Sequence, residues 1–235
     1  MTERKRTAAV FLDVDDTLLD FHKAEAIALA KTLTAMGIEP REEILKRYSE
    51  INDSQWKLLE QGLIPREVVL VRRFEILFEE LGLERSGAEA RDTYEGNLAV
   101  GHYFMPGAPE LLETLYRNYE LYIVSNGTAV VQEGRIKSAG IAKYFKEIFI
   151  SEEIGCDKPG KEFFRRCFER ILDFDPKQAI IVGDRLSSDI LGGINAGIKT
   201  CWFNPDRQEN RTEIFPDYEI RALGELPALL KEIFV

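Results

Sequence analysis

The stretch AAVFLDVDDTLLDF, residues 8–21, decides the fold, because an apolar run passes at once into a cluster of carboxylates. Its first five residues have the length and composition of a buried strand. Similar runs occur at 121–124 and 179–182; Ser125 directly follows the first, and Gly183 and Asp184 follow the second. In an open parallel α/β sheet the carboxyl ends of the strands gather at one edge, where ligands bind. Residues far apart in the sequence are therefore expected to meet there.

The segment from about residue 22 to residue 101 has a helical period throughout. Apolar positions such as Ile27, Leu29 and Leu33 recur on one helical face. Further helices, separated by turns that contain glycine or proline, are expected at 42–60, 66–81 and 88–100. Because no strand-like run interrupts them, we expect an all-helical insert between the first and second strands.

The remainder of the chain alternates between strands and helices. Strands are expected at 121–124, 148–151, 179–182 and 200–203. Helices are expected from Pro109, which suits a first helical position, and at 130–139, 161–172, 188–196 and 225–233. Such alternation predicts an α/β fold with a doubly wound, Rossmann-like parallel sheet. We assign residues 1–20 and 104–235 to this core and residues 21–103 to a helical cap.

Composition and charge argue against several classes of protein and of binding partner. The chain has 235 residues and a net charge of −10, which argues against nucleic acid or an anionic membrane as a partner. No run approaches the roughly 20 apolar residues that cross a bilayer, and the start does not have the pattern of a signal peptide. The three cysteines lack metal spacing, and Cys156 is expected to be a half-buried thiol. We expect a cytoplasmic protein, either monomer or homodimer.

The carboxylates after the first strand suit covalent catalysis. Asp13 is placed to act as a nucleophile on phosphorus, and Asp15, two residues on, as a general acid and base. Thr17 is expected to hold the turn and Asp13 through hydrogen bonds to the backbone, and we count it among the phosphate-binding residues. The structural alternative is an acidic loop that caps a helix. Three crowded aspartates repel one another, however, unless a cation shares the space.

Carboxylates after the strand at 179–182 supply the partner for such a cation. Asp184 follows this strand, and Asp189 lies five residues further on. Together with Asp13 and the main-chain carbonyl of Asp15, Asp184 predicts an oxygen-rich Mg²⁺ site. Asp189 is expected to lie behind the direct metal ligands, where it orients metal-bound water or Lys158. Its structural alternative is a residue that favours a helix dipole.

Polar residues after the strand at 121–124 are suited to binding phosphate. Ser125, Asn126 and Gly127 offer a hydroxyl, an amide and unhindered backbone N–H groups for phosphate oxygens, although Ser-Asn-Gly is also a common turn sequence. Lys158 is expected to bring positive charge to the phosphoryl group and to Asp13. A phosphate dianion that approaches a carboxylate is repelled, and Mg²⁺ with one lysine offsets that repulsion.

Aromatic residues of the insert are candidates for binding the rest of the substrate. Phe21 and His22 follow the carboxylate loop, and Trp56 lies in a polar stretch of the second helix. An aromatic ring there can stack on a base or a sugar, although ordinary packing is the alternative interpretation. Two arginines, Arg72 and Arg73, are expected on a solvated helix face.

These four segments, in this order and after these strands, resemble those of the haloacid dehalogenase superfamily of phosphatases. The resemblance covers nearly the whole chain and implies the following roles: Asp13 as nucleophile, Asp15 as acid and base, Ser125 and Lys158 in phosphate binding, and Asp184 with Asp189 in the metal motif. Dehalogenases of the superfamily lack the second aspartate, so Asp15 favours phosphate chemistry. Asp16 stands where the family often has glycine.

The sequence at 182–197, with TCWFNP at 200–205, is similar to that of the pyrimidine 5′-nucleotidase branch. This similarity implies a nucleoside monophosphate as the substrate. Sugar-phosphate phosphatases, including the acylneuraminate-9-phosphatase type, share much of the same core and remain an alternative. A phosphomutase or a non-catalytic regulator on the same fold are further alternatives, although a regulator would not need Asp13, Asp15 and Lys158 together.

Overall fold

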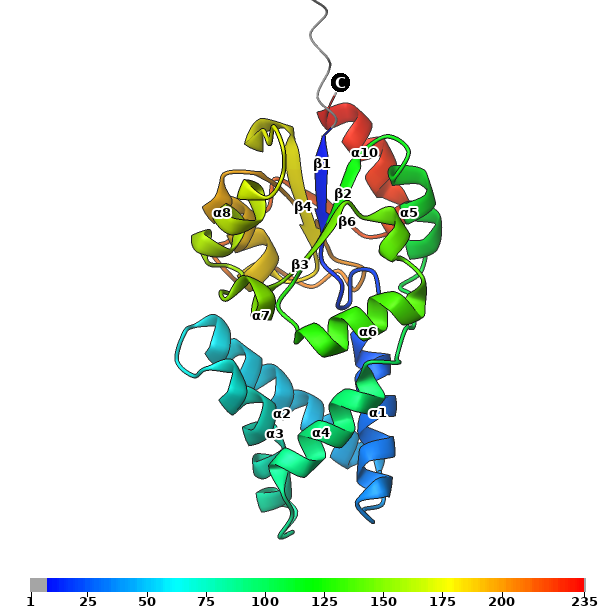
Figure 1. Cartoon of the computed structure of the whole chain (residues 1–235), viewed down its shortest axis with the longest axis vertical. Coiled ribbons are helices and arrows are strands. Elements are labelled where there is room, and N and C mark those ends of the chain that lie inside the picture. Colours follow the sequence, from blue (N-terminus) through cyan, green and yellow to red (C-terminus); the bar gives the residue numbers. More distant parts are fainter. Residues whose placement is uncertain (1–7, 235) are drawn as a thin grey trace, which may run out of the picture. The chain divides into compact units, whose positions relative to one another are not determined.

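The structure is a computed structural model that describes residues 8–234, and it divides into two compact units (Figure 1). The first unit comprises residues 8–20, 104–129 and 140–234, and the second comprises 21–103 and 130–139. Residues 1–7, where the sequence shows no signal-peptide pattern and where we begin the core, lie outside the described range.

Within residues 8–234 the first unit forms one parallel sheet of six strands, in the order β3-β2-β1-β4-β5-β6. Its strands are β1 (Ala9–Leu12), β2 (Glu120–Ser125), β3 (Glu147–Ile150), β4 (Ala179–Gly183), β5 (Lys199–Phe203) and β6 (Tyr218–Ile220). The central strands consist almost wholly of buried residues, as expected for a sheet covered on both faces. The predicted doubly wound fold is confirmed.

The strand order reverses direction between β1 and β4. These two strands pair in parallel, with Leu12 beside Val182. Such a reversal point is where open α/β sheets bind ligands, at the carboxyl ends of the strands. The residues that follow β1 and β4 therefore lie where folds of this type bind their ligands.

Helices cover the two faces of the sheet, with α8 on one side and α5 and α10 on the other (Figure 1). The helices of this unit are α5 (Ala108–Leu115), α7 (Ser151–Ile154), α8 (Lys161–Glu169), α9 (Leu191–Ala196) and α10 (Leu226–Ile233). On one face Phe163, Phe164 and Cys167 of α8 pack in a buried cluster with strand residues such as Phe11 and Tyr122. This apolar layer fixes the strands, and with them the loops at their carboxyl ends.

The second unit is helical in all its regular structure. It contains α1 (Phe21–Ala35), α2 (Glu42–Glu60), α3 (Arg66–Glu80), α4 (Gly87–Leu98) and most of α6 (Ala129–Ala139). Its core joins one apolar face of each helix, with Leu33, Tyr48, Phe74 and Tyr94 fully buried. The helical period of the sequence therefore gave the correct elements here.

Helix α6 belongs to the second unit although it lies far along the chain from the rest of that unit. Gly134 lies so close to α4's end that an added Cβ would stand 2.7 Å from the Ala99 carbonyl oxygen. Arg135 is fully buried and donates to the Gly101 carbonyl oxygen over 3.1 Å. The division made from sequence placed these residues in the core segment 104–235, whereas their contacts group them with the helices of residues 21–103.

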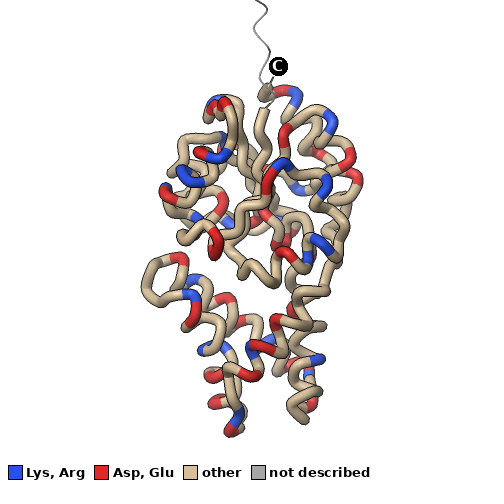
Figure 2. The backbone as a smooth tube through the Cα atoms, in the orientation of Figure 1, with Lys and Arg blue, Asp and Glu red and all other residues tan. Residues whose placement is uncertain are grey.

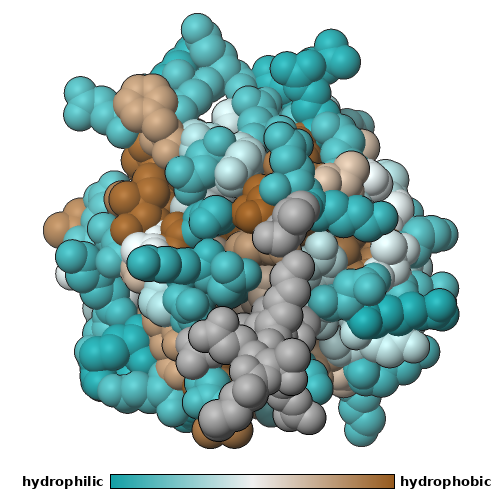
Figure 3. Space-filling view, turned by 90° about the horizontal axis from the view of Figure 1, so that it is seen from above, coloured by the Kyte–Doolittle hydropathy of each residue, from teal (hydrophilic) through white to brown (hydrophobic). Residues whose placement is uncertain are grey.

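Charged residues of both signs are interspersed along the helices of both units (Figure 2). The face of the first unit seen in Figure 3 is covered mostly by hydrophilic side chains, with small apolar patches between them. In the described part of the chain, no helix is long and apolar enough to cross a membrane. Cys156, Cys167 and Cys201 have free thiols, and Cys156 is half-buried as expected.

Two further details of the fold differ from the sequence-based expectations. The edge strand β6 was not predicted, because three residues with a single buried side chain give no periodic signal. Arg73 was expected in solvent, but it is buried and donates a 2.9 Å hydrogen bond to Asn52 Oδ1. Arg72, in contrast, is exposed and pairs with Glu75. The pattern of two adjacent arginines does not reveal which one points inward.

Candidate active site

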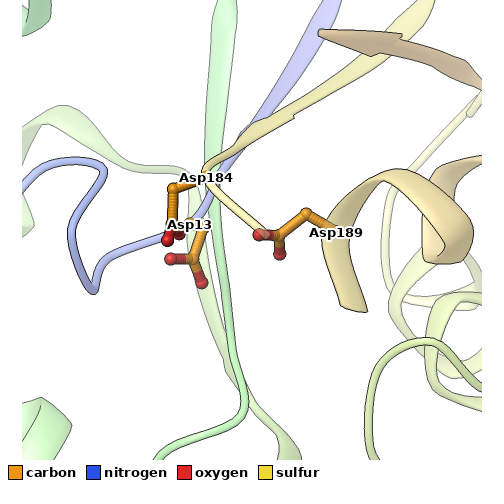
Figure 4. Close-up of side chains that lie close together, drawn as sticks. All are labelled: Asp13, Asp184 and Asp189. Carbon is orange, nitrogen blue, oxygen red and sulfur yellow. The ribbon is translucent and has the colours of Figure 1, made fainter. Parts of the chain in front are cut away.

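Asp13 is the first residue after β1 and is buried at the sheet edge. Its main-chain N–H donates to the Val182 carbonyl oxygen of β4 over 3.0 Å, which extends the strand pairing by one bond. In Figure 4 its carboxyl group lies beside that of Asp184, and Asp189 points toward both from the helical turn after β4. The carboxyl ends of two neighbouring strands thus bring together Asp13 and Asp184, which are 171 positions apart in the sequence.

The loop after Asp13 is tightly folded. The Asp16 N–H donates to the Leu19 carbonyl oxygen over 2.8 Å, and Asp16 has a φ of 55°. This left-handed backbone favours glycine, and aspartate is one of the few other residues that tolerate it. The departure from the family's glycine at position 16 therefore preserves the turn. Asp15 is half-buried in the same loop.

Thr17 is fully buried and reaches the second carboxylate segment. Its hydroxyl donates to Asp184 Oδ1 over 3.4 Å. We expected this hydroxyl to hold Asp13 through the backbone, but the bond that the structure shows goes to the Asp184 side chain. Thr17 therefore links the loop after β1 to the loop after β4.

Lys158 is the central cation of the site. It is 1% exposed, and its Nζ donates to three oxygens at 2.7 Å. These acceptors are Asp13 Oδ1, Asp189 Oδ1 and the Val124 carbonyl. Three short bonds use all three donors of an ammonium group, so the charge is held in one position.

The Ser125–Gly127 loop holds the main chain beside that lysine. The Asn126 side chain donates to the Lys158 carbonyl oxygen and accepts from the Lys158 N–H, both at 2.8 Å. Ser125 is buried, and its hydroxyl accepts from the Gly127 N–H over 3.2 Å. The expected amide for phosphate oxygens is thus engaged in fixing Lys158, while the loop itself lies at the carboxyl end of β2.

Asp189 is buried, and both of its oxygens have partners. Oδ1 accepts from Lys158 Nζ, and Oδ2 accepts from the Arg185 N–H over 3.1 Å. Asp189 belongs to a single π-helical turn, Leu186–Ile190, of the kind often found at functional sites. A side chain at position 183 would collide with it, because an added Cβ would lie 2.3 Å from Asp189 Cγ. Glycine at 183 lets Asp189 approach the strand end.

The carboxyl groups repel one another in a site that is largely closed to water. Burial raises the pKa of Asp13 to about 7, against the opposing effect of Lys158, and the charges of Asp189 and Asp15 add to the rise. Burial likewise raises the pKa of Asp184 well above its ordinary value, aided by Asp13 and Asp189. Burial acts to lower the pKa of Lys158, but Asp13 and Asp189 raise it above the usual value, so the lysine stays charged.

The donor set fits a divalent cation that prefers oxygen. One carboxylate oxygen each of Asp13, Asp184 and Asp189 lies within 4.8 Å of the others. Three carboxylates against one lysine leave an excess of negative charge, which a divalent ion would offset. Carboxylate oxygens are the ligands that Mg²⁺ prefers. Asp13 and Asp184 suit direct ligands, and Asp189, with both oxygens already bonded, suits a position behind them.

Three predicted substrate residues, Phe21, His22 and Trp56, lie in the second unit. Phe21 and His22 begin α1, where the Phe21 ring packs 5.6 Å from the Arg135 guanidinium and His22 is exposed. Trp56 lies on α2, half-buried, and its indole N–H donates to Asn52 Oδ1 over 3.1 Å. None of the three belongs to the carboxylate cluster of the first unit.

Sequence reasoning missed two sets of contacts. In the second unit, Asn52 also donates to Glu25 Oε1 over 2.8 Å, which joins Glu25, Asn52 and Arg73 in one buried network. In the first unit, the Trp202 indole N–H donates to the Asp184 carbonyl oxygen over 2.8 Å. Only the strand order could have revealed the second contact, because Trp202 lies on the strand next to β4.

The fold and the site together define a doubly wound α/β protein with a carboxylate cluster at the ends of two neighbouring parallel strands. A model of the haloacid dehalogenase-like hydrolase family matches residues 7–197. The chain therefore belongs to this family and is an enzyme of the hydrolase class.

Several proteins, one of them with a solved structure, are similar to this one over nearly the whole chain. The HAD-hydrolase YfnB of Bacillus subtilis is 42% identical over 96% of each chain. Its crystal structure, bound to magnesium and described as revealing interdomain movement, matches with a TM-score of 0.91 over 96% of this chain and 99% of that one. Pyrimidine 5′-nucleotidase PynA of Streptococcus pneumoniae is 36% identical over 92% of each chain. Pyrimidine 5′-nucleotidase YjjG of Escherichia coli is 32% identical over 94% of this chain and 96% of its own.

Proposed function

We propose that the protein is a Mg²⁺-dependent phosphomonoester hydrolase that acts on nucleoside 5′-monophosphates, with a preference for pyrimidines. The observation that carries the proposal is the position of Lys158, whose Nζ is bonded to Asp13 and Asp189 at 2.7 Å beside the carboxyl group of Asp184. A fixed cation next to a carboxylate nucleophile suits a substrate that bears negative charge. The preference for pyrimidines rests on the names of two similar proteins, PynA and YjjG.

In the proposed reaction Asp13 attacks phosphorus and the bond to the ester oxygen breaks, which leaves an aspartyl-phosphate on Asp13. Asp15 gives its proton to the leaving oxygen, so that the nucleoside departs as a neutral alcohol. Asp15 then takes a proton from water, which attacks the same phosphorus and releases inorganic phosphate together with the free Asp13 carboxylate. Lys158 and the Ser125 hydroxyl, at the carboxyl end of β2, stabilise charge on the phosphoryl oxygens.

A bound magnesium ion would supply further positive charge at the phosphoryl group. Asp13, Asp184 and the Asp15 carbonyl would hold it, as predicted from the sequence, with Asp189 behind them. Burial raises the pKa of Asp13 and of Asp184 because it disfavours their charged forms. A cation beside the two carboxylates would offset this effect by stabilising the charged forms, which supports the assignment.

Selection of the leaving group is proposed to lie in residues 21–103, which would act as a cap on the site. Trp56 is suited to stacking, because its indole N–H is held by Asn52 and its ring has the Arg66 guanidinium 5.6 Å away. Trp56→Ala is expected to raise KM for UMP about tenfold, with little change for glycerol 2-phosphate, whose leaving group has no ring. An equal change for both substrates would contradict a role in recognising the nucleoside.

The test is phosphate release from a panel of esters, with Mg²⁺ and then with EDTA. The panel contains UMP, dUMP, dTMP, purine monophosphates, sugar phosphates and an acylneuraminate 9-phosphate. Mg²⁺-dependent preference for pyrimidine nucleotides supports the proposal, and preference for a sugar phosphate would keep the chemistry but change the substrate. No release from any ester would overturn it. Borohydride reduction during turnover should convert Asp13 to homoserine if the aspartyl-phosphate forms.

A further inference from the structure

Trp202 lies beside the metal-ligand segment without being one of its carboxylates. It is the fourth residue of β5, is 5% exposed and pairs with Gly183, the last residue of β4. Asp184 follows Gly183 and lies beyond the strand, so the regular strand pairing no longer holds its main chain. The Trp202 indole N–H nevertheless reaches past the strand end and donates to the Asp184 carbonyl oxygen at 2.8 Å.

The main chain at Gly183 and Asp184 needs a hydrogen bond such as the one from Trp202 to hold it in place. Gly183 cannot carry a side chain, since an added Cβ would lie 2.3 Å from Asp189 Cγ. Glycine, however, leaves the backbone freer than any other residue does. The close approach of Asp189 therefore puts the most flexible residue type immediately before Asp184.

The two carboxylates that suit direct metal binding are anchored differently. The Asp13 main chain is held by a strand bond, since its N–H donates to Val182 of β4 at 3.0 Å. The Asp184 main chain is held by a side chain, through the indole of Trp202. An indole nitrogen can only donate, and a buried one normally finds an acceptor. Removal of that donor would leave the Asp184 carbonyl without this bond while most of the ring packing is kept.

We propose that Trp202 is a positioning residue that fixes the main chain at Asp184 and thereby holds its carboxyl group in the arrangement that binds the metal. This inference rests on the proposed metal site. It assigns to Trp202 no contact with the substrate. Trp202 would affect the affinity for the metal. Mutation of residues that hold metal ligands in place commonly weakens metal binding about 10- to 100-fold.

The test measures Mn²⁺ affinity directly, from the electron paramagnetic resonance signal of the free ion, with Mn²⁺ standing in for Mg²⁺ at an oxygen site. Trp202→Phe is expected to raise the Mn²⁺ Kd about tenfold. Thr200→Val is the matched control, because it removes two part-buried hydrogen bonds between the Thr200 hydroxyl and Asp217 from the same strand, away from the carboxylates. Its Mn²⁺ Kd should stay within about twofold of wild type.

Wild type and Asp184→Asn separate the failure of this inference from the failure of the metal site. Mn²⁺ binding by wild type but not by Asp184→Asn supports the metal site itself. If wild type binds and Trp202→Phe binds equally well, only the role of Trp202 is overturned. An equal loss in Thr200→Val would also overturn it, since the effect would then follow sheet stability. Absence of binding by wild type would overturn the metal site and this inference together.

A second variant covers the case in which Trp202→Phe does not fold. The chain has two tryptophans, so a Trp56→Phe background leaves Trp202 as the sole site for global replacement by 3-benzothienylalanine. That analogue keeps the bicyclic ring and replaces N–H by sulfur. Weaker Mn²⁺ binding than in the Trp56→Phe parent supports the role of the N–H group, and unchanged binding contradicts it.

Discussion

Each unit of the molecule buries charged side chains, but the two clusters are balanced differently. At the sheet edge Asp13 and Asp189 share one lysine, Lys158, and Asp184 lies beside these two carboxylates. In the helical unit one carboxylate, Glu25, and one guanidinium, Arg73, are joined through the neutral side chain of Asn52. The first cluster has an excess of negative charge, and the second contains equal numbers of opposite charges.

The difference separates a reactive site from a structural network. Equal charges bridged by an amide satisfy one another and tie α1, α2 and α3 together. Three carboxylates around one lysine leave negative charge that the lysine does not balance. Such an excess is typical of sites that bind a cation or a substrate. The predictions that follow change one cluster at a time, in order of expected effect.

Asp13→Asn should reduce phosphate release by at least about 10⁴-fold, because it removes the nucleophile. The fold should be retained, since burial already disfavours the charged form of Asp13. Phosphate release and circular dichroism measure the two effects. Full activity in this variant would contradict the mechanism.

Lys158→Met should destabilise the protein by about 3–5 kcal/mol without Mg²⁺, because it leaves Asp13 and Asp189 buried without their cation. Urea unfolding measures the change. Lys161→Met is the matched control: Lys161 is exposed three residues further on, and its loss should cost less than about 0.5 kcal/mol. Similar losses for both variants would refute the central position of Lys158.

Arg73→Met should cost less, about 1–3 kcal/mol, because Asn52 Oδ1 keeps the Trp56 N–H as a donor. The exposed neighbour provides the comparison: Arg72→Met should change the unfolding free energy by less than about 0.5 kcal/mol. Unfolding curves for both variants decide the matter. If Arg72 proves the more costly loss, the assignment of the buried arginine is wrong.

Glu25→Gln should have the smallest effect, seen as a change in pH dependence. Burial raises the pKa of Glu25 above its ordinary 4.5, so the folded state binds this proton more tightly than the unfolded state. The stability that this group contributes is therefore greatest below pH 4.5 and falls as pH rises through the raised pKa. In Glu25→Gln the Tm should no longer decrease over this pH range on account of residue 25. Glu42→Gln, at an exposed position, should behave as wild type, and parallel Tm profiles for all three proteins would count against the shift.

Most of the helices and strands could be predicted from the sequence, because they depend on local patterns. Apolar runs predicted five of the six strands in the described residues, and polar residues at strand ends predicted that Asp13 and Asp184 lie at one edge of the sheet. The roles of these two aspartates stay predictions. Strand order adds what no local pattern contains. Asp13 and Asp184 are neighbours because β1 and β4 are adjacent at the reversal of the sheet.

Contacts that depend on side-chain direction could not be predicted. Arg72 and Arg73 are adjacent and alike in sequence, yet only Arg73 points into the helical core. The bonds between the Asn126 side chain and the Lys158 main chain were not predicted, and phosphate binding by Asn126 stays a prediction. Trp202 required knowledge of which strand lies next to β4. In each case the sequence gives the residue type, and three-dimensional packing decides its partner.

The membership of α6 in the helical unit has a consequence for protein engineering and for domain exchange in evolution. The chain passes between the units four times, at residues 20–21, 103–104, 129–130 and 139–140. A graft of residues 21–103 alone would leave behind Gly134, whose backbone lies against Ala99, and Arg135, which is bonded to Gly101. The exchangeable module is therefore discontinuous, and a chimera that keeps its interior intact has to carry residues 130–139 from the same parent.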